Sequence, residues 1–238
     1  MMKFIILVFI FSIIGCSQRI KVPINRMMTP EVIGKGIDLE YEQIGFSEGR
    51  LDFTNSETDN ALLMGGASNR SLYMALGIAD NTDIFIKVPQ ESSSLLGIKV
   101  QIIGTPSKVR SVGNQLAFTI AMGSERDTFE GQYNINLKSD VKDYSLIYGY
   151  RANELALVYA SFSISHYSFE GNIKGASAVL NSDEIDYQAQ NVLGGQLGIE
   201  LGGPSFALKA EISAQKIKWS NTEEQLLYFS GLALRSTF

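Results

Sequence analysis

Residues 72–88 read LYMALGIADNTDIFIKV, and this stretch decides the fold. Apolar side chains stand at every second position from Leu72 to Ile78 and again from Ile84 to Val88. A period of two gives an extended strand one apolar face, and the sequence Asp-Asn-Thr-Asp between the two runs is typical of a tight turn. The stretch therefore predicts a β-hairpin with one apolar face on each strand.

The same alternation recurs from Gly36 to the end of the chain, without a convincing helix. We expect about ten strands, within a range of eight to twelve. They lie near residues 37–46, 72–78, 84–88, 96–102, 116–122, 144–150, 158–164, 197–201, 206–212 and 228–238. The apolar residues of 132–143 have the opposite phase to those of 144–150, so we expect one strand extended past a β-bulge.

The predicted connections fall into two alternating series. Short turns at 80–83, 150–154 and 202–205, with a longer connection at 105–114, form one series. The other series is more polar and holds 90–94, 124–131, 170–187, 220–224 and the stretch 47–70. This alternation resembles the short periplasmic turns and longer extracellular loops of bacterial outer-membrane barrels.

The polar faces of the strands choose between two arrangements of an antiparallel sheet. A soluble barrel or sandwich hides its apolar face inside, whereas a membrane barrel turns that face to lipid. The polar faces carry Gly, Ala, Ser, Thr and Gln, and only 19% of the chain is charged, which favours a crowded lumen over a solvated face. Sparse charges in such a lumen must pair. The lumen charges that we predict are Lys99, Glu200, Lys209, Glu211 and Arg235.

The chain ends at Phe238, with Tyr228, Leu232 and Leu234 on the same predicted face. This pattern resembles the terminal-strand signal of outer-membrane barrels, and the resemblance implies the barrel assembly machinery as a partner. We therefore predict an all-β chain. Its fold is a closed antiparallel up-and-down transmembrane barrel over 36–238, similar to the small OmpA/OmpW-like class.

The N-terminus carries an export signal. Residues 1–15 have one lysine followed by a short apolar run, which is too short to span a membrane as a stable helix. The sequence Ile-Ile-Gly-Cys at 13–16 resembles the lipobox of bacterial lipoproteins, which implies acylation of Cys16 and a location in the outer membrane. Two prolines and no periodicity predict a flexible linker over 16–35. An even number of strands returns both ends of the barrel to one side, which suits an anchor in the inner leaflet.

Chemistry-bearing motifs are sparse. One histidine and one cysteine give no metal site, no cofactor motif occurs, and a net charge of −5 argues against a nucleic-acid partner. His166 and Ser168 lie two residues apart, and therefore on one strand face. Their spacing resembles the His-x-Ser motif of outer-membrane lipid A deacylases. By position, the resemblance makes His166 the base, Ser168 the nucleophile, and Glu170 or Glu184 the acid.

Three functions follow as hypotheses. The sequence favours a non-enzymatic barrel with a structural or surface-binding role and a largely plugged lumen. In this hypothesis the partners of the barrel are outer-membrane lipid, which surrounds it, and an external ligand, which binds at loops 47–70 and 170–187. The first alternative is a small-solute porin, and the second is a deacylase-like esterase using His166 and Ser168. A lipid-tethered soluble sandwich remains the competing fold.

Overall fold

A computed structural model describes residues 17–52, 61–90, 92–129, 133–175, 183–218 and 224–238. The predicted signal peptide and Cys16 lie outside these residues. None of the described residues forms a helix that is long and apolar enough to cross a membrane. The strands are β1 (Ser17–Pro23), β2 (Gly36–Asp52), β3 (Ala61–Ala79), β4 (Thr82–Pro89), β5 (Leu95–Ile103), β6 (Gly113–Phe129), β7 (Tyr133–Asn153), β8 (Ala156–Gly175), β9 (Asp183–Gly202), β10 (Phe206–Ile217) and β11 (Gln225–Thr237).

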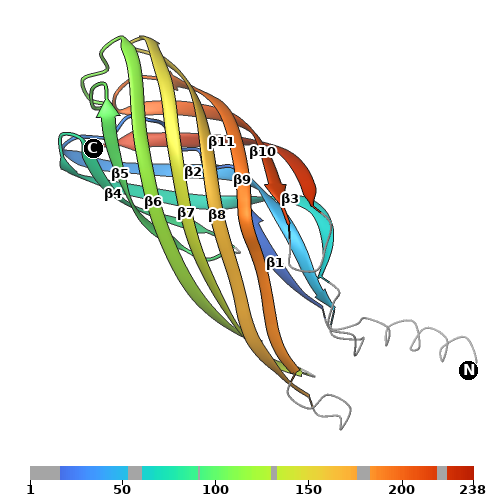
Figure 1. The fold of residues 1–238 in the computed structure, drawn as a ribbon. Coiled ribbons are helices and arrows are strands. Elements are labelled where there is room, and N and C mark those ends of the chain that lie inside the picture. The colour runs from blue at the N-terminus through green and yellow to red at the C-terminus, as the bar shows by residue number, and fades with distance from the viewer. Residues whose placement is uncertain (1–16, 53–60, 91, 130–132, 176–182, 219–223) are drawn as a thin grey trace, which may run out of the picture.

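Strands β2 to β11 form a closed antiparallel barrel in which each strand pairs with its neighbour in the chain (Figure 1). The barrel closes where β11 pairs with β2, from Leu232 opposite Gln43 to Thr237 opposite Asp38. Strand β3 occupies the other edge of β2 along its length. The predicted closed barrel of about ten strands is confirmed.

An additional strand, β1, extends the sheet where β11 leaves β2. It pairs antiparallel with β2 from Pro23 opposite Phe46 to Ser17 opposite Asp52. One edge of β2 is paired with β3 along its length. Strand β1 therefore lies on the opposite edge, which pairs with β11 only from Asp38 to Gln43. No sequence pattern predicted this strand.

The two ends of the barrel differ as expected. Connections 80–81, 104–112, 154–155 and 203–205 lie at the end that holds Phe238, and we call it the short-turn end. The opposite, long-strand end holds the connections after β2, β4, β6, β8 and β10. The strands there run further than predicted, so the loops expected at 47–70, 124–131 and 170–187 shrink to 53–60, 130–132 and 176–182. Their polar residues lie largely on strands.

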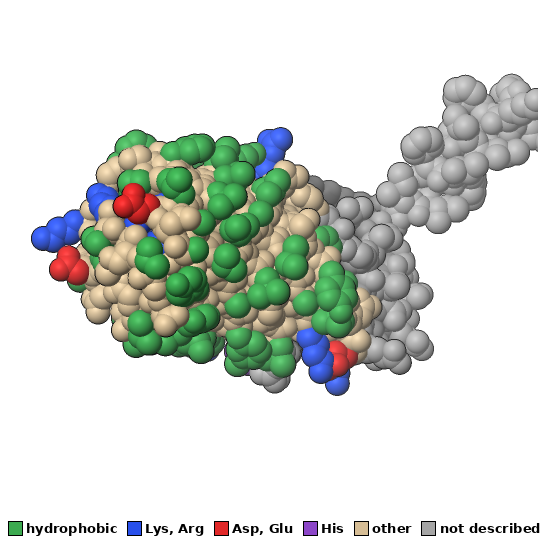
Figure 2. All heavy atoms as spheres, turned by 90° about the horizontal axis from the view of Figure 1, so that it is seen from above, with side chains coloured by type: hydrophobic (Ala, Val, Ile, Leu, Met, Phe, Trp, Pro, Cys, Tyr) green, Lys and Arg blue, Asp and Glu red, His purple; other side chains and the backbone are tan. Residues whose placement is uncertain are grey.

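The outer wall around the short-turn half is apolar. Its exposed side chains include Leu72, Leu76, Ile98, Leu146, Val158, Leu197, Leu208 and Leu234. Figure 2 shows hydrophobic side chains spread over this wall, with the few charged groups at its edges. Such a belt outside a closed barrel suits lipid, because the strands β2 to β11 pair with neighbours on both sides there and their apolar faces meet hydrocarbon.

The amphipathic pattern inverts along the longest strands. On β7, Tyr144 and Leu146 face outward, whereas Leu137 and Val141 face inward and are buried. The pairing of β7 with β8 is continuous from Tyr133 to Arg151, so the predicted bulge between the two phases is wrong. The phase changes because the surroundings change: β6 to β9 project beyond β4 and β5 (Figure 1), and their outer face becomes polar where the belt ends.

Two arginine substitutions on the outer face of β7 test this boundary. We expect Leu146→Arg to lower the free energy of unfolding in lipid vesicles by about 2–4 kcal/mol, since it places a cation in the apolar belt. Asn136→Arg, exposed on the same face, should change it by less than about 0.5 kcal/mol. Urea titration followed by heat-modifiable gel migration measures both. Equal effects would contradict the inversion.

Candidate functional site in the barrel lumen

The inner wall of the barrel is densely charged. Among the described residues, eight acidic and seven basic side chains are buried, nearly all on the inner face or on chain packed inside it. Lys99, Glu200, Lys209, Glu211 and Arg235, named from the sequence as lumen charges, lie there and are each exposed by 4% or less. Buried charges at this density need oppositely charged or hydrogen-bonding partners. Many of these partners come from one segment of the chain that lies inside the barrel.

Residues 24–34 pass through the lumen. Every residue from Ile24 to Gly34 is buried, and no strand or helix is assigned to them. The prediction of a flexible linker over 16–35 is therefore wrong for residues 17–34, which form β1 and this lumen segment. Of the two prolines that suggested a linker, Pro23 is the last residue of β1 and Pro30 lies in the irregular segment, which is held by the wall instead of by strand pairing.

Two wall carboxylates accept hydrogen bonds from backbone N–H groups of the lumen segment. Glu211 on β10 accepts from the amides of Arg26 and Met27, both at 3.0 Å. Asp83 on β4 accepts from the amide of Ile33 at 3.0 and 3.1 Å. An irregular segment leaves such amides without strand partners, and leaving them buried and unpaired is costly.

Three wall lysines donate hydrogen bonds to backbone carbonyls of the same segment. The bonds join Lys87 to the carbonyl of Arg26 (2.8 Å), Lys209 to that of Met27 (3.2 Å) and Lys99 to that of Glu31 (2.6 Å). Acids thus bind the segment's donors, and lysines bind its acceptors. The wall therefore places acceptors opposite N–H groups and donors opposite carbonyl groups at several points along the segment.

Met27 shows how firmly this backbone is held. Its φ of 56° is in the left-handed region, which a methionine rarely adopts. The surrounding contacts impose it, because Glu211 binds the Met27 amide and Lys209 binds its carbonyl.

Two charged side chains of the segment also pair with the wall. Arg26 contacts Asp143 on β7 at 2.7 Å and donates to Ser165 on β8 at 2.7 Å. Glu31 receives two hydrogen bonds from Arg151, one of them at 2.6 Å. These pairs are fully buried, so neither partner can be removed without leaving a buried charge.

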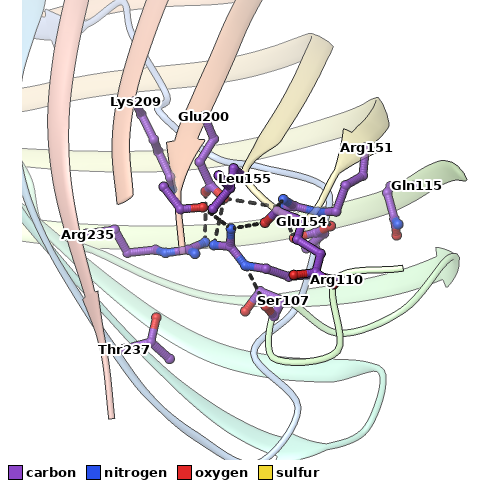
Figure 3. Close-up of polar contacts among 12 residues, drawn as sticks. Ser107, Arg110, Gln115, Arg151, Glu154, Leu155, Glu200, Lys209, Arg235 and Thr237 are labelled. Atoms are coloured by element: carbon purple, nitrogen blue, oxygen red, sulfur yellow. Dashed lines mark hydrogen bonds and ion pairs between the residues drawn. The ribbon is translucent and has the colours of Figure 1, made fainter. Parts of the chain in front are cut away.

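A cluster around Glu200 closes the short-turn end (Figure 3). Its carboxylate contacts Arg235 at 2.8 Å, and Arg110 and Arg151 at 3.2 Å each. Arg110 comes from the connection 104–112, which folds inward, and it also donates to the carbonyls of Gly202 and Glu154. The connection is therefore bound to Glu200 of β9, whose carboxylate also contacts arginines of β7 and β11.

The lumen beyond the charged zone is apolar. Tyr167 and Phe169 of β8 stack with their rings nearly parallel, 6.4 Å apart. They belong to a buried cluster with Leu137, Val192 and Val22, the last of which is supplied by β1. The same cluster continues to Tyr73, Phe85 and Ile147, so the inward face of the projecting strands extends a core that runs along the lumen.

Sequence reasoning missed most of the lumen charges. The wall residues it omitted are Asp38, Glu40, Glu42, Asp83, Lys87, Asp143 and Arg151. The first three alternate with Ile37, Leu39 and Tyr41, so the period of two would have found them on β2. The charges of the lumen segment, Arg26 and Glu31, have no such signal.

His166 and Ser168 lie on the outer face of β8, where the apolar belt ends. Across the strand pair, Lys142 is opposite His166 and Asp140 is opposite Ser168. Residues opposite each other on one face are near neighbours, so Lys142 lies beside the imidazole and Asp140 lies beside the serine hydroxyl. Hydrogen bonds from Lys138 and Ser124 lower the pKa of the Asp140 carboxyl.

Neither predicted acid stands opposite His166. Glu184 pairs with Asn172, four residues along β8 from Ser168, which separates them by about 13 Å of strand. Glu170 is opposite Lys138 on the neighbouring strand. The structure brings histidine and serine together on one face without bringing Glu184 to them.

The remaining predicted site residues lie where the alternation put them. Tyr228, Leu232, Leu234 and Phe238 all face outward and are exposed by 46% or more. Within the described part of the chain, no group of three or more metal-ligating side chains occurs.

Two solved structures that match this chain over most of its length are the following. One is the attachment invasion locus protein Ail of Yersinia pestis, solved in complex with the heparin analogue sucrose octasulfate. It is 13% identical with a TM-score of 0.38, over 85% of this chain and 97% of that one. The other is the N-terminal β-barrel domain of Pseudomonas aeruginosa OprF, also 13% identical, with a TM-score of 0.33 over 86% and 99%. No protein-family model and no curated protein matches the sequence.

Replacing Glu200 should destabilise the barrel strongly. Glu200→Gln leaves three buried guanidinium groups without their shared carboxylate, and we expect a loss of about 3–5 kcal/mol in the free energy of unfolding. Glu224→Gln is the matched control, because Glu224 pairs with Lys216 in a half-exposed position and such pairs contribute about 0–1 kcal/mol. Similar losses from both variants would show that the Glu200 cluster does not hold the short-turn end.

Proposed function

We propose that this chain is a lipid-anchored barrel of the bacterial outer membrane with a structural or surface-binding role, and that its lumen is closed from within. The observation that carries the proposal is the buried segment 24–34, bound through both its backbone polarity and its side chains. A pore for small solutes would need that space. The inward-folded connection 104–112 adds a second closure at the short-turn end.

The orientation follows from the two ends. Short turns face the periplasm in outer-membrane barrels and the longer ends face outward. The long-strand end, with the polar outer faces of β6 to β9, then stands outside the cell. An external ligand would meet these projecting strands, and the loops expected to bind it, 47–70 and 170–187, lie partly outside the described residues.

Conductance in planar bilayers tests the closed lumen. We expect the wild type to give no steady single-channel steps, and a variant lacking residues 17–34 to give them, since the deletion empties the lumen. Heat-modifiable migration on gels verifies that the variant has folded. If the deletion prevents folding, Arg26→Ala/Glu31→Ala serves instead, because it removes only the segment's charged side chains.

Steady steps from the wild type would contradict the closed lumen and favour the small-solute porin. A folded deletion variant that does not conduct would contradict closure by the segment alone. Adding Arg110→Ala to that variant, which frees connection 104–112 from Glu200, then tests the second closure.

A disulfide tests the path of the segment directly. Asn25 donates a hydrogen bond to Ser213 of β10 at 2.7 Å. We therefore expect Asn25→Cys/Ser213→Cys to form a disulfide in the folded protein, seen as faster migration on non-reducing denaturing gels. Asn25→Cys/Ser205→Cys is the matched control, because Ser205 lies in the 203–205 turn, and it should not cross-link.

The anchor is tested by labelling cells with radioactive palmitate. We expect the wild-type protein to carry label and Cys16→Ser to lose it. Label retained in Cys16→Ser would show that the resemblance to the lipobox is accidental.

A further inference from the structure

The direction of β1 fixes where the chain enters the barrel. Ser17 is opposite Asp52, the last residue of β2 before the connection at the long-strand end, and Pro23 is opposite Phe46, further inside. The chain therefore runs from the long-strand end inward as it passes from Ser17 to Pro23.

The lumen segment continues in the same direction. Asn25 binds Ser213, and the next two amides bind Glu211, which is two residues closer to the short-turn end on β10. Ile33 binds Asp83, directly beside the turn at 80–81. The contacts are thus ordered along the barrel axis, and the segment crosses the lumen once.

The exit lies at the short-turn end. Gly34 has a φ of +78°, and its carbonyl oxygen comes within 1.6 Å of where a Cβ on Gly77 would stand, so only glycine allows the approach at Gly77. Lys108 of the inward-folded connection donates to the carbonyls of Lys35 and Phe238, which holds the exit beside the C-terminus. Eleven residues from Ile24 to Gly34 can span up to about 36 Å, enough to cross an apolar belt of about 25 Å.

We infer that the N-terminus of the mature chain is displayed at the cell surface, with the following residues threaded through the barrel to the periplasmic end. The inference rests on the orientation in the proposed function. It reverses the expectation of an inner-leaflet anchor: β2 begins and β11 ends on the periplasmic side, but residues 17–34 carry the chain back to the other side. A lipid on Cys16, which directly precedes Ser17, would enter the outer leaflet.

A barrel that inserts into the membrane by itself does not need a lipid to stay there. The topology inferred above gives the lipid anchor a different role. β1 is seven residues long and pairs with β2 only. A lipid at its outer end resists withdrawal of the segment into the periplasm, so the lipid retains the lumen segment rather than the barrel.

Cysteine accessibility on intact cells tests the inference. The variants are Arg19→Cys in β1, Lys218→Cys at the long-strand end and Ser205→Cys at the short-turn end, each treated with a membrane-impermeant maleimide before and after permeabilisation. Wild type gives the background from Cys16. We expect Arg19→Cys to label in intact cells as fully as Lys218→Cys, and Ser205→Cys to label only after permeabilisation.

The possible outcomes separate this inference from the proposed function. Arg19→Cys labelling only after permeabilisation, alongside Ser205→Cys, overturns the surface N-terminus and leaves the barrel orientation standing. Ser205→Cys labelling in intact cells while Lys218→Cys does not overturns the orientation instead. If Arg19→Cys is shielded in both conditions, a protease site inserted between Ser17 and Gln18 decides. Cleavage by protease added to intact cells supports the inference, and its absence contradicts it.

Discussion

The structure depends on one requirement: the backbone of residues 24–34 is buried without being part of a helix or sheet, so its polar groups must find partners elsewhere. The inner wall meets that requirement with side chains. Carboxylates of Asp83 and Glu211 bind amides, and Lys87, Lys99 and Lys209 bind carbonyls. If the lumen charges only paired with one another, acids and lysines would not need to follow the path of the segment's backbone.

The same requirement explains the order of the other interactions. Lys87 also pairs with Glu42 and Lys209 with Glu40, so two of the three lysines that hold the segment are themselves held by β2. The third, Lys99, pairs with Asp83 of β4. Removing the segment would leave the Asp143 carboxylate without Arg26 and the Arg151 guanidinium with only Glu200. Segment and wall therefore stabilise each other, so the segment takes its place in the lumen as part of folding.

The inversion of the strand faces marks the level at which the surroundings of the barrel change from lipid to water. Within the belt, apolar residues face out because hydrocarbon surrounds them. Beyond it, Tyr167 and Phe169 turn inward and residues such as Asn136 and Asp140 face out. One continuous strand serves both solvents by changing the chemistry of each face, without a change of register.

The pattern of the strands was accessible from the sequence because a β-strand shows its two faces at every second residue. Leu72 to Ile78 and Leu208 to Ile212 could be placed on the outer face, and Lys99 and Glu211 on the inner one, with no knowledge of the neighbours. The loops at 47–70 and 170–187 were overestimated for a related reason: polar residues on projecting strands look like loop residues when the outer face is expected to be apolar.

The sequence by itself determined the all-β architecture, the closed barrel with an apolar exterior, and the difference between its two ends, since each follows from local alternation and turn residues. Only the tertiary structure decided the fate of residues 17–34. Their partners come from β2, β4, β5, β7, β8 and β10, all but β2 far away in the chain, and an irregular segment has no periodicity from which they could be predicted. Physically, strand faces are a local property, whereas the filling of a lumen is set by which distant groups happen to surround it.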